Sequence, residues 1–256
     1  SKNIAIVGTR KATEMGKKRV DTLLHELAET GYHPNIISGL AYGIDITAHT
    51  ACIHYGLKAQ AVLGHGLHMV YPASHKNMAE KILEQGGALI SEFPTCAQIL
   101  PTNFLQRNRI VAGMSEAILV AESPIKGGAM STARQALSYN REVMAIPGRP
   151  EDPTFAGCNL LIKQNIAALV ENIKDLLRIL NWPPLPTGPY QMSLDLFPIT
   201  NNEVLLLEIL LKRGEQNIDQ LHQLTRIPVH DLSVLLLKLE LEGHVMQLPG
   251  NCYTLI

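Results

Sequence analysis

Short apolar runs alternate with longer amphipathic runs over residues 1–182. Asn3–Val7 is short and apolar, and Met15–Thr30 then carries apolar residues at helical spacing. The other strand-like runs are Asn35–Ile37, Ala59–Leu63, Ala88–Ser91, Ala117–Ala121 and Glu142–Ile146, and the other helical stretches are Ile44–Tyr55, Ser74–Gln85, Phe104–Met114 and Ser131–Tyr139. Continuously apolar strands that alternate with helices are typical of a parallel sheet covered on both faces. The pattern therefore predicts an α/β fold of the doubly wound kind.

The last part of the chain has a different pattern. Helical spacing over Glu203–Lys212, Ile218–Leu224 and Val229–Glu242 predicts three helices. Two short strand-like runs, Val245–Leu248 and Tyr253–Ile256, then flank a Pro-Gly-Asn turn. Three helices followed by a hairpin indicate a small winged-helix module.

Proline content and charge separate the two parts. Residues 182–198 hold five of the fifteen prolines, so this segment cannot continue a helix or a central strand. We therefore expect a core domain at 1–182, a proline-rich linker at 183–198 and the winged-helix module at 199–256. The core carries eighteen Lys and Arg against fifteen Asp and Glu, whereas the chain from residue 183 onward carries four against eight.

Composition excludes several classes of protein. With 46% hydrophobic and 18% charged residues the chain can bury a full core, which excludes a mainly disordered protein. The net charge of −1 means that any nucleic-acid site is a local patch. The longest apolar run, Val204–Leu211, is short and includes Glu208, so we expect no transmembrane helix. The four cysteines are isolated and no signal peptide is evident, which together suggest the cytoplasm.

Glycines follow several of the predicted strands. They are Gly8, Gly39, Gly64, Gly66 and the pair Gly127 and Gly128. In a doubly wound sheet these positions lie at the carboxyl ends of the strands, where helix N-termini point and where glycine lets a phosphate approach the backbone. The hydroxyl groups beside these loops belong to Ser38, Ser131 and Thr132. Glycines of this kind also make ordinary tight turns, but four converging loops favour an anion site.

Basic residues accompany these loops. They are Arg10 and Lys11 after the first strand, Lys76 near the third loop and Lys126 before the glycine pair. The stretch from Phe104 to Arg109 combines an aromatic ring, two guanidinium groups and an amide. An aromatic ring that stacks on a base, with arginines that neutralise phosphates, is the chemistry of single-strand binding. Taken by itself, this stretch favours the other interpretation, in which Phe104 belongs to the core and the arginines form surface ion pairs.

Candidates for catalysis and for metal binding are few. Asp45 and His49 are spaced one helical turn apart, and a buried hydrogen-bonded pair is favoured there over a functional base. His65, His68 and His75 have no settled metal-ligand spacing. Neither a G-x-G-x-x-G stretch after the first strand nor a complete Walker motif is present. We therefore predict no catalytic residue, no metal and no cofactor.

Taken together, several motifs resemble one family, the bacterial DNA-processing protein A (DprA, or Smf) family. The matching stretches occur in the family's order over residues 3–165: IVGTR, SGLAYGIDITAH, GHGLHMVYP, GGALISEFP, FLQRNRIVAGMS, GGAMSTARQAL and AIPG. The resemblance implies a Rossmann-like DNA-binding core without catalytic turnover. It also implies a homodimer that binds single-stranded DNA and hands it to the recombinase RecA, notably in natural transformation.

The resemblance also implies roles for particular residues. Gly8, Thr9 and Arg10 belong to the GTR turn, where the arginine is expected to contact phosphate. The expected lining of the nucleic-acid pocket consists of Ser38, Gly39, Gly128 and Ser131. Thr132 and Lys126 join this set on the chemistry of their loop and not on the resemblance. Phe104 and Asn108 are expected to meet a base or the backbone, with Arg107 nearby, and Lys76 matches the family loosely.

The chain departs from the family pattern at two positions. Thr9 stands where serine is commoner, which keeps the hydroxyl, and His68 stands where an acidic residue is usual. Many members also carry a small helical domain before the core, and residues 1–256 do not include it. The third helix of the winged-helix module offers few cations for a phosphate surface, so we interpret that module as a protein-contact or accessory module.

Two other functions compete with this interpretation. A nucleotide-processing enzyme of the phosphoribohydrolase kind would need a glutamate in the run from Lys126 to Gln135, and none stands at that spacing. A ligand-sensing transcription regulator rests on the winged helix alone, and the acidic charge of that module counts against it.

Overall fold

The computed structural model describes residues 2–182, 201–241, 243–248 and 250–255. The chain separates into two compact units, residues 1–187 and 188–256, each described here by itself. The predicted linker at 183–198 lies outside the described residues. The domain boundaries predicted from the sequence stay predictions.

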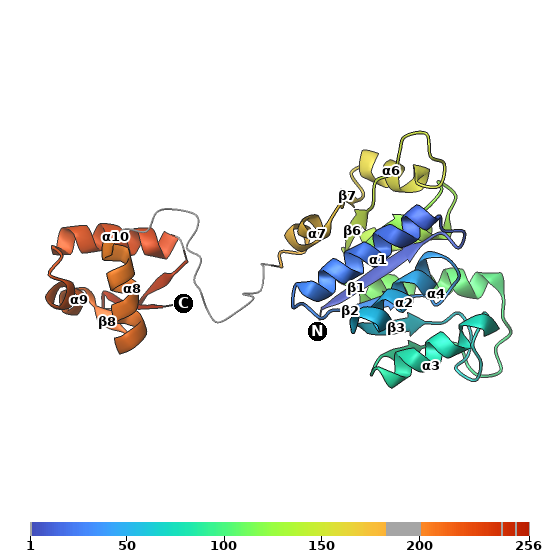
Figure 1. Ribbon diagram of the computed structural model, residues 1–256, viewed down its shortest axis with the longest axis horizontal. Helices are drawn as coiled ribbons and strands as arrows, with labels where there is room; N and C mark the ends of the chain where they lie inside the picture. The colour runs from blue at the N-terminus through green and yellow to red at the C-terminus, as the bar shows by residue number, and fades with distance from the viewer. Residues whose placement is uncertain (1, 183–200, 242, 249, 256) are drawn as a thin grey trace. The chain divides into compact units, whose positions relative to one another are not determined.

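The first unit is built on one seven-stranded parallel sheet (Figure 1). Its strands are β1 (Asn3–Gly8), β2 (Asn35–Ser38), β3 (Lys58–Val62), β4 (Ala88–Ile90), β5 (Ala117–Glu122), β6 (Glu142–Ala145) and β7 (Ala168–Leu169). Their order across the sheet is β4-β3-β2-β1-β5-β6-β7, and each neighbouring pair is parallel. Successive strands therefore move outward from β1 in one direction and from β5 in the other. The order reverses between β1 and β5, which makes this pair the topological switch point.

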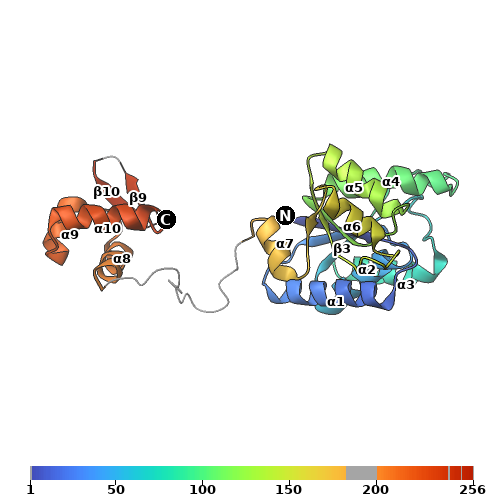
Figure 2. The ribbon, with the colours of Figure 1, turned by 90° about the horizontal axis from the view of Figure 1, so that it is seen from above.

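Helices cover both faces of the sheet (Figure 2). They are α1 (Glu14–Glu29), α2 (Ile44–Tyr55), α3 (Lys76–Glu84), α4 (Pro101–Met114), α5 (Gly128–Ser138), α6 (Ala156–Lys163) and α7 (Ile173–Ile179), with a short 3₁₀ turn η1 (Ala73–His75) before α3. Helices α1, α2 and α3 lie on one face, whereas α4 and α5 pack together on the other. The prediction of a doubly wound α/β fold is confirmed.

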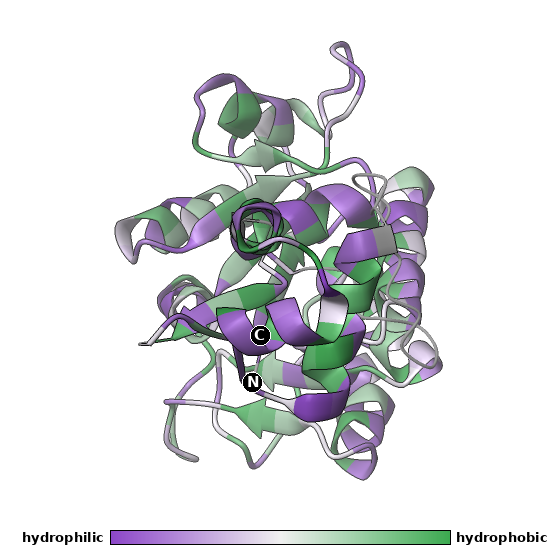
Figure 3. Ribbon diagram, turned by 90° about the vertical axis from the view of Figure 1, so that its left-hand side faces the viewer, coloured by the Kyte–Doolittle hydropathy of each residue, from purple (hydrophilic) through white to green (hydrophobic). Residues whose placement is uncertain are grey.

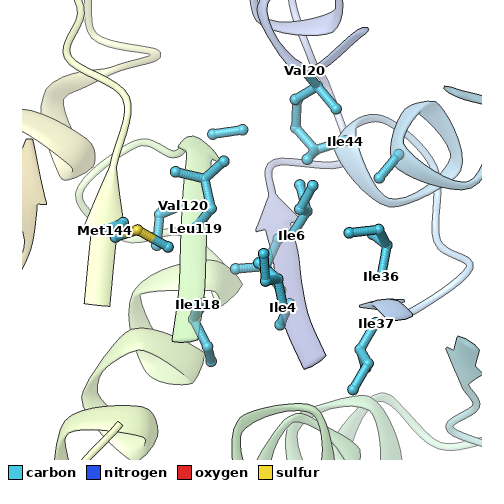
Figure 4. Packing of buried hydrophobic residues seen from close by; sticks show 14 of the residues in the cluster. Ile4, Ile6, Val20, Ile36, Ile37, Ile44, Ile118, Leu119, Val120 and Met144 are labelled. Carbon is cyan, nitrogen blue, oxygen red and sulfur yellow. The ribbon is translucent and has the colours of Figure 1, made fainter. Parts of the chain in front are cut away.

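The core of this unit forms between the strands and the helices. Ile4 and Ile6 of β1 are at most 1% exposed, and Leu119 of β5 is fully buried beside them. Figure 4 shows these side chains together with Val20 of α1 and Ile44 of α2. Because central strands are covered on both faces, nearly every residue of β1 and β5 is buried, as the short apolar runs predicted. Figure 3 colours each residue by its hydropathy, and the helices there carry both hydrophilic (purple) and hydrophobic (green) residues.

Over residues 201–241, 243–248 and 250–255, the second unit contains three helices and a three-stranded antiparallel sheet. These elements are α8 (Asn201–Arg213), β8 (Gln216–Asn217), α9 (Ile218–Thr225), α10 (Val229–Leu241), β9 (Val245–Leu248) and β10 (Cys252–Leu255). The sheet order is β8-β10-β9, and buried leucines of α8, α9 and α10, among them Leu206, Leu221 and Leu236, build a separate core. The prediction of a winged-helix module is confirmed.

Candidate nucleic-acid site

A crevice of about 460 Å³ opens at the carboxyl ends of β1, β2 and β5. We call it the strand-end crevice. Its lining comes from the loops after these three strands and from one side of α4. The lining residues are Val7, Gly8, Thr9, Arg10, Gly39, Ala41, Asp45, Pro101, Phe104, Leu105, Arg107, Asn108, Val111, Gly127, Gly128, Ala129 and Thr132. The crevice thus lies at the switch point, where loops on either side diverge and doubly wound folds bind ligands.

The structure brings together nine of the thirteen residues that the sequence singled out. Gly8, Thr9, Arg10, Gly39, Phe104, Arg107, Asn108, Gly128 and Thr132 all line the crevice. Ser38, Lys76, Lys126 and Ser131 do not line it. Ser38 is buried, and its hydroxyl donates a 2.7 Å hydrogen bond to the carbonyl of Ile6.

Arg10 is held at the mouth of the crevice by the loop between β1 and α1. The Thr9 amide donates a 2.7 Å hydrogen bond to the carbonyl of Glu122, at the end of the neighbouring strand β5. The buried Glu122 carboxylate accepts a 3.0 Å hydrogen bond from the Thr13 hydroxyl and another from the Thr13 amide. Both ends of the loop are therefore tied to β5, while the Arg10 side chain is exposed between them. Glu122 went unnoticed in the sequence, although an acidic residue that ends an apolar strand is a usable signal.

An arginine and an aromatic ring form the entrance. The guanidinium carbon of Arg10 lies 5.3 Å from the centroid of the Phe104 ring, within the range of a cation–π interaction. The ring of Tyr71 lies next to Phe104, with 5.8 Å between the two centroids, and the Tyr71 side chain is about half exposed. Phe104 itself is only partly buried, so the entrance offers both a cation and aromatic surface.

Helix α4 supplies a whole face to the crevice. Pro101, Phe104, Leu105 and Asn108 all line it, and the last three follow Pro101 by three, four and seven residues. Side chains at this spacing share one face of a helix. The predicted helix began at Phe104 and so left out Pro101, and Leu105 was inside that helix but was not singled out as a site residue. Helical spacing from Phe104 and Asn108 could have found both.

Arg107 lies beneath the entrance and is only 4% exposed. Its Nη1 donates a hydrogen bond to the carbonyl of Val62, and its Nε has no hydrogen-bond partner among the described residues. The interpretation as a surface ion pair is therefore wrong for Arg107. It is correct for Arg109, which pairs with Glu92 on the surface. A Cβ atom on Gly39 would collide with the Arg107 guanidinium, so a side chain there would displace the guanidinium from its present position.

Two buried charged residues of the strand-end crevice, Arg107 and Asp45, influence each other's pKa. Burial lowers the pKa of Arg107 and the nearby Arg10 lowers it further, while the charge of Asp45 opposes both effects. Burial raises the pKa of Asp45, against the opposing effect of Arg107 and of a 3.4 Å hydrogen bond from the Ala41 amide. Two guanidinium groups and one carboxyl group therefore face the crevice, which favours an anionic ligand.

The predicted hydrogen-bonded pair of Asp45 and His49 is wrong. Both residues are buried, but neither ring nitrogen of His49 has a hydrogen-bond partner in the described part of the chain. Burial, with Arg107 and His75 nearby, lowers the pKa of His49 to about 3, so the ring is neutral. Helical spacing brought the two residues to neighbouring turns without aligning their polar atoms.

Two of the three histidines considered as metal ligands, His65 and His75, lie within hydrogen-bonding distance of backbone atoms of nearby loops. His65 is buried, and its Nε2 accepts a 3.1 Å hydrogen bond from the Tyr71 amide, while its Nδ1 lies 3.0 Å from the Gly66 carbonyl. His75 Nδ1 lies 2.8 Å from the Leu40 carbonyl, and His68 is exposed. Among the residues that the structure describes, no three His, Cys, Asp or Glu side chains are placed to hold a metal ion.

The winged-helix unit presents few cations. The single lysine of α10, Lys238, forms a 2.7 Å ion pair with the buried carboxylate of Glu203, and the helix has no arginine. Val234 and Leu237 of the same helix are 58% and 57% exposed. The hairpin strands β9 and β10 carry neither lysine nor arginine. Within the described ranges, no helix of either unit is long and apolar enough to cross a membrane.

The fold and the crevice define a class of protein: a doubly wound α/β domain with an arginine-lined crevice at its switch point, joined in sequence to a winged-helix domain. Residues 1–181 match the family DNA recombination-mediator protein A, and residues 205–251 match the DprA winged helix domain. The chain belongs to this DprA/Smf family.

Relatives and solved structures agree with this assignment. The chain is 37% identical to protein Smf of Escherichia coli over 256 residues, which cover 97% of this chain and 66% of that protein. It is 36% identical to DNA processing protein DprA of Streptococcus pneumoniae over 68% of this chain and 60% of that protein. The solved structure of the Streptococcus pneumoniae protein superimposes with a TM-score of 0.63 at 35% identity, over 69% of this chain and 61% of that one.

A second solved structure concerns DNA binding directly. DNA processing protein A from Helicobacter pylori, described for its single-stranded DNA binding mode, superimposes with a TM-score of 0.60 at 30% identity. The match covers 70% of this chain and 80% of that one.

Proposed function

We propose that this chain binds single-stranded DNA in the strand-end crevice without chemical turnover. The observation that carries the proposal is the position of Arg10 over the Phe104 ring at the mouth of the crevice. A base that stacks on Phe104 would bring its flanking phosphate toward the Arg10 guanidinium. Stacking and phosphate neutralisation are the two contributions by which proteins bind single strands without reading their sequence.

The interior of the crevice supports the same ligand. Gly127 and Gly128 begin α5, and a Cβ atom on Gly128 would meet no other atom within 4 Å. This open space lets a sugar–phosphate backbone approach the first amides of the helix, which favour an anion. Arg107 supplies a second positive charge from below.

We further propose that the bound strand is protected and then handed to a RecA-type recombinase, in recombination and in natural transformation. The description of the matched family as a recombination mediator supports this step. We also propose that the chain acts as a homodimer, because two crevices on one strand would raise the overall affinity. We place its action in the cytoplasm.

The winged-helix unit has another role in this proposal. A helix that reads a DNA groove normally brings arginine or lysine to the phosphates. The single lysine of α10 is paired with Glu203, and the helix exposes Val234 and Leu237. We therefore propose that this unit contacts protein rather than duplex DNA.

Fluorescence anisotropy tests the central proposal. A labelled thymine oligonucleotide is titrated with the full chain at several salt concentrations, with unlabelled duplex of the same length as competitor. We expect salt-sensitive binding that the duplex competes poorly. Equal competition by duplex and single strand would contradict the proposal, and nucleotides would then be tested as substrates.

A further inference from the structure

A second hollow shares Arg10 with the strand-end crevice. It is lined by Arg10, Lys11, Ala12, Lys17, Tyr42, Gly43 and Ile46, and we call it the Tyr42 hollow. It is more open than the crevice and lies between the loop after β1, the start of α1 and the loop after β2. Because Arg10 lines both spaces, a strand that leaves the crevice past Arg10 enters this hollow.

Close backbone packing makes the two loops one surface. The Ile44 amide donates a 3.2 Å hydrogen bond to the carbonyl of Thr9. Gly43 has a φ of +75°, and a Cβ atom there would collide with the Thr9 carbonyl, so glycine is needed for this approach. The contact fixes Tyr42, the residue before Gly43, beside Arg10 and Lys11.

The hollow carries three cations and one exposed aromatic ring. Lys11 is exposed, and the Lys17 side chain is 41% exposed. Lys17 pairs with Glu14 at 2.7 Å, but the Glu14 side chain is 89% exposed. A surface pair of this kind contributes little, so a phosphate can take its place.

Tyr42 is held in place and still half exposed. Its hydroxyl lies 3.2 Å from the Ser74 hydroxyl, and its ring meets the His75 ring edge-on, with 4.8 Å between the centroids. Half of the side chain remains open to solvent. An aromatic ring that is anchored in this way loses little entropy when a base stacks on it.

We propose that the Tyr42 hollow is a second nucleotide subsite. The strand continues from the crevice past Arg10, one of its bases stacks on Tyr42, and Lys11 and Lys17 neutralise the phosphates on either side. This inference rests on the proposed function, since it extends the same single strand. It assigns a path to the strand, away from Phe104 and toward α1.

The experiment compares short and long thymine oligonucleotides. An oligonucleotide of about six nucleotides covers the crevice alone, and one of about fifteen nucleotides reaches the hollow as well. The measured quantity is the gain in affinity from the short to the long probe, by anisotropy with the full chain. The variants are the double substitution Lys11→Ala with Lys17→Ala, Tyr42→Leu, and Tyr42→Phe, which keeps the ring. The matched control, Lys58→Ala with Lys163→Ala, removes two exposed lysines away from the strand-end crevice. Lys58 begins β3, and Lys163 ends α6, the helix that leads into β7.

We expect the double variant to reduce the length-dependent gain about tenfold and to lower the salt slope for the long probe by roughly 1.4. Tyr42→Leu should reduce the gain by a similar factor, whereas Tyr42→Phe, which keeps the ring and its contact with His75, should retain most of it. The lysine control should leave it unchanged. Binding of the short probe should be the same in all of these proteins.

Two results would overturn the inference. An unchanged gain in both the double variant and Tyr42→Leu, with the short probe bound normally, would remove the second subsite and leave the crevice in place. Failure of the wild-type chain to bind the short probe in a way that depends on Arg10 would overturn the proposed function, and the second subsite with it.

Discussion

The Arg10 guanidinium lies over the Phe104 ring, and this contact joins the loop after β1 to helix α4 across the mouth of the strand-end crevice. The two residues are far apart in sequence: Arg10 lies in the loop between β1 and α1, and Phe104 lies in α4. Together they give the crevice its positive charge and its aromatic surface. The first predictions follow from this pair.

Substitution of Arg10 by alanine is expected to weaken single-strand binding about tenfold or more at low salt and to lower the salt slope by roughly 0.7, because one phosphate contact is lost. The side chain is exposed, so the melting temperature should not change. Arg178→Ala, which removes a 77% exposed arginine of α7, is the matched control. Equal losses in both variants would show that only the total charge matters.

Substitution of Phe104 by leucine is expected to weaken binding about tenfold, because base stacking on an aromatic ring contributes roughly 1–3 kcal/mol. Phe104→Trp should restore most of the affinity. The salt slope should be the same in all three proteins, since no charge is altered. An affinity that depends on the hydrophobicity of this residue and not on its aromaticity would contradict stacking.

Two glycines of the crevice are expected to respond differently to alanine. Gly128→Ala should leave the melting temperature unchanged and weaken DNA binding, because the added methyl group meets only the space that the strand would occupy. Gly39→Ala should lower both stability and affinity, because the methyl group collides with Arg107. Thermal melts and anisotropy on the same samples separate the two effects. Unchanged DNA affinity in Gly128→Ala would place the strand elsewhere.

The buried His49 is expected to make stability depend on pH. Its pKa falls from 6.5 in the unfolded chain to about 3 in the folded protein, so below pH 6.5 the unfolded state binds more protons. Stability is therefore lost as the pH falls, by about 1.4 kcal/mol per pH unit once the unfolded histidine is charged. The raised pKa of Asp45 acts in the opposite direction above its ordinary value of 3.8.

Because the two groups oppose each other, the informative quantity is the difference between wild type and His49→Leu. Urea unfolding at several pH values between about 7 and 4 measures it. The variant should lose less stability than wild type on acidification, with the difference growing as the pH falls. Parallel curves for the two proteins would mean that His49 is protonated in the fold.

Removal of the winged-helix unit is expected to leave single-strand binding within about threefold of the full chain, because its described surface supplies few cations to a phosphate backbone. A chain of residues 1–182, which keeps the whole core cluster, is compared with the full chain on the same oligonucleotide. Duplex binding by the full chain that disappears in the shorter one would show instead that the unit reads DNA.

The loops of the crevice could be predicted because parallel topology alone gathers the residues that follow each strand. Arg10 and Gly128 come from different loops, yet both had to lie at the same edge of the sheet. The strands missed, β7 and β8, have two residues each, which is too few for any periodicity. Two short helices were missed as well, α6 with eight residues and α7 with seven. Helix α5 begins at Gly128, three residues before the sequence pattern indicated.

Side-chain orientation limited the rest of the prediction. Ser38 follows a strand closely enough to seem part of the site, but its hydroxyl turns to the neighbouring strand β1. Tyr71 contacts Phe104 only because a loop folds back over α4, and no local pattern encodes that contact. The buried polar atoms of His49 and Arg107 were also missed. Their burial depends on how α2 and α4 pack, and the spacing of residues along each helix does not reveal it.

Photochemical crosslinking tests the central claim most directly. A thymine oligonucleotide that carries 5-iododeoxyuridine is irradiated in complex with the full chain, and the attached tryptic peptide is identified by mass spectrometry. The account predicts crosslinking to the peptide 82–107, at Phe104, with loss of that crosslink in Phe104→Leu. Crosslinks confined to the winged-helix unit, or to surfaces of the core away from the strand-end crevice, would contradict it.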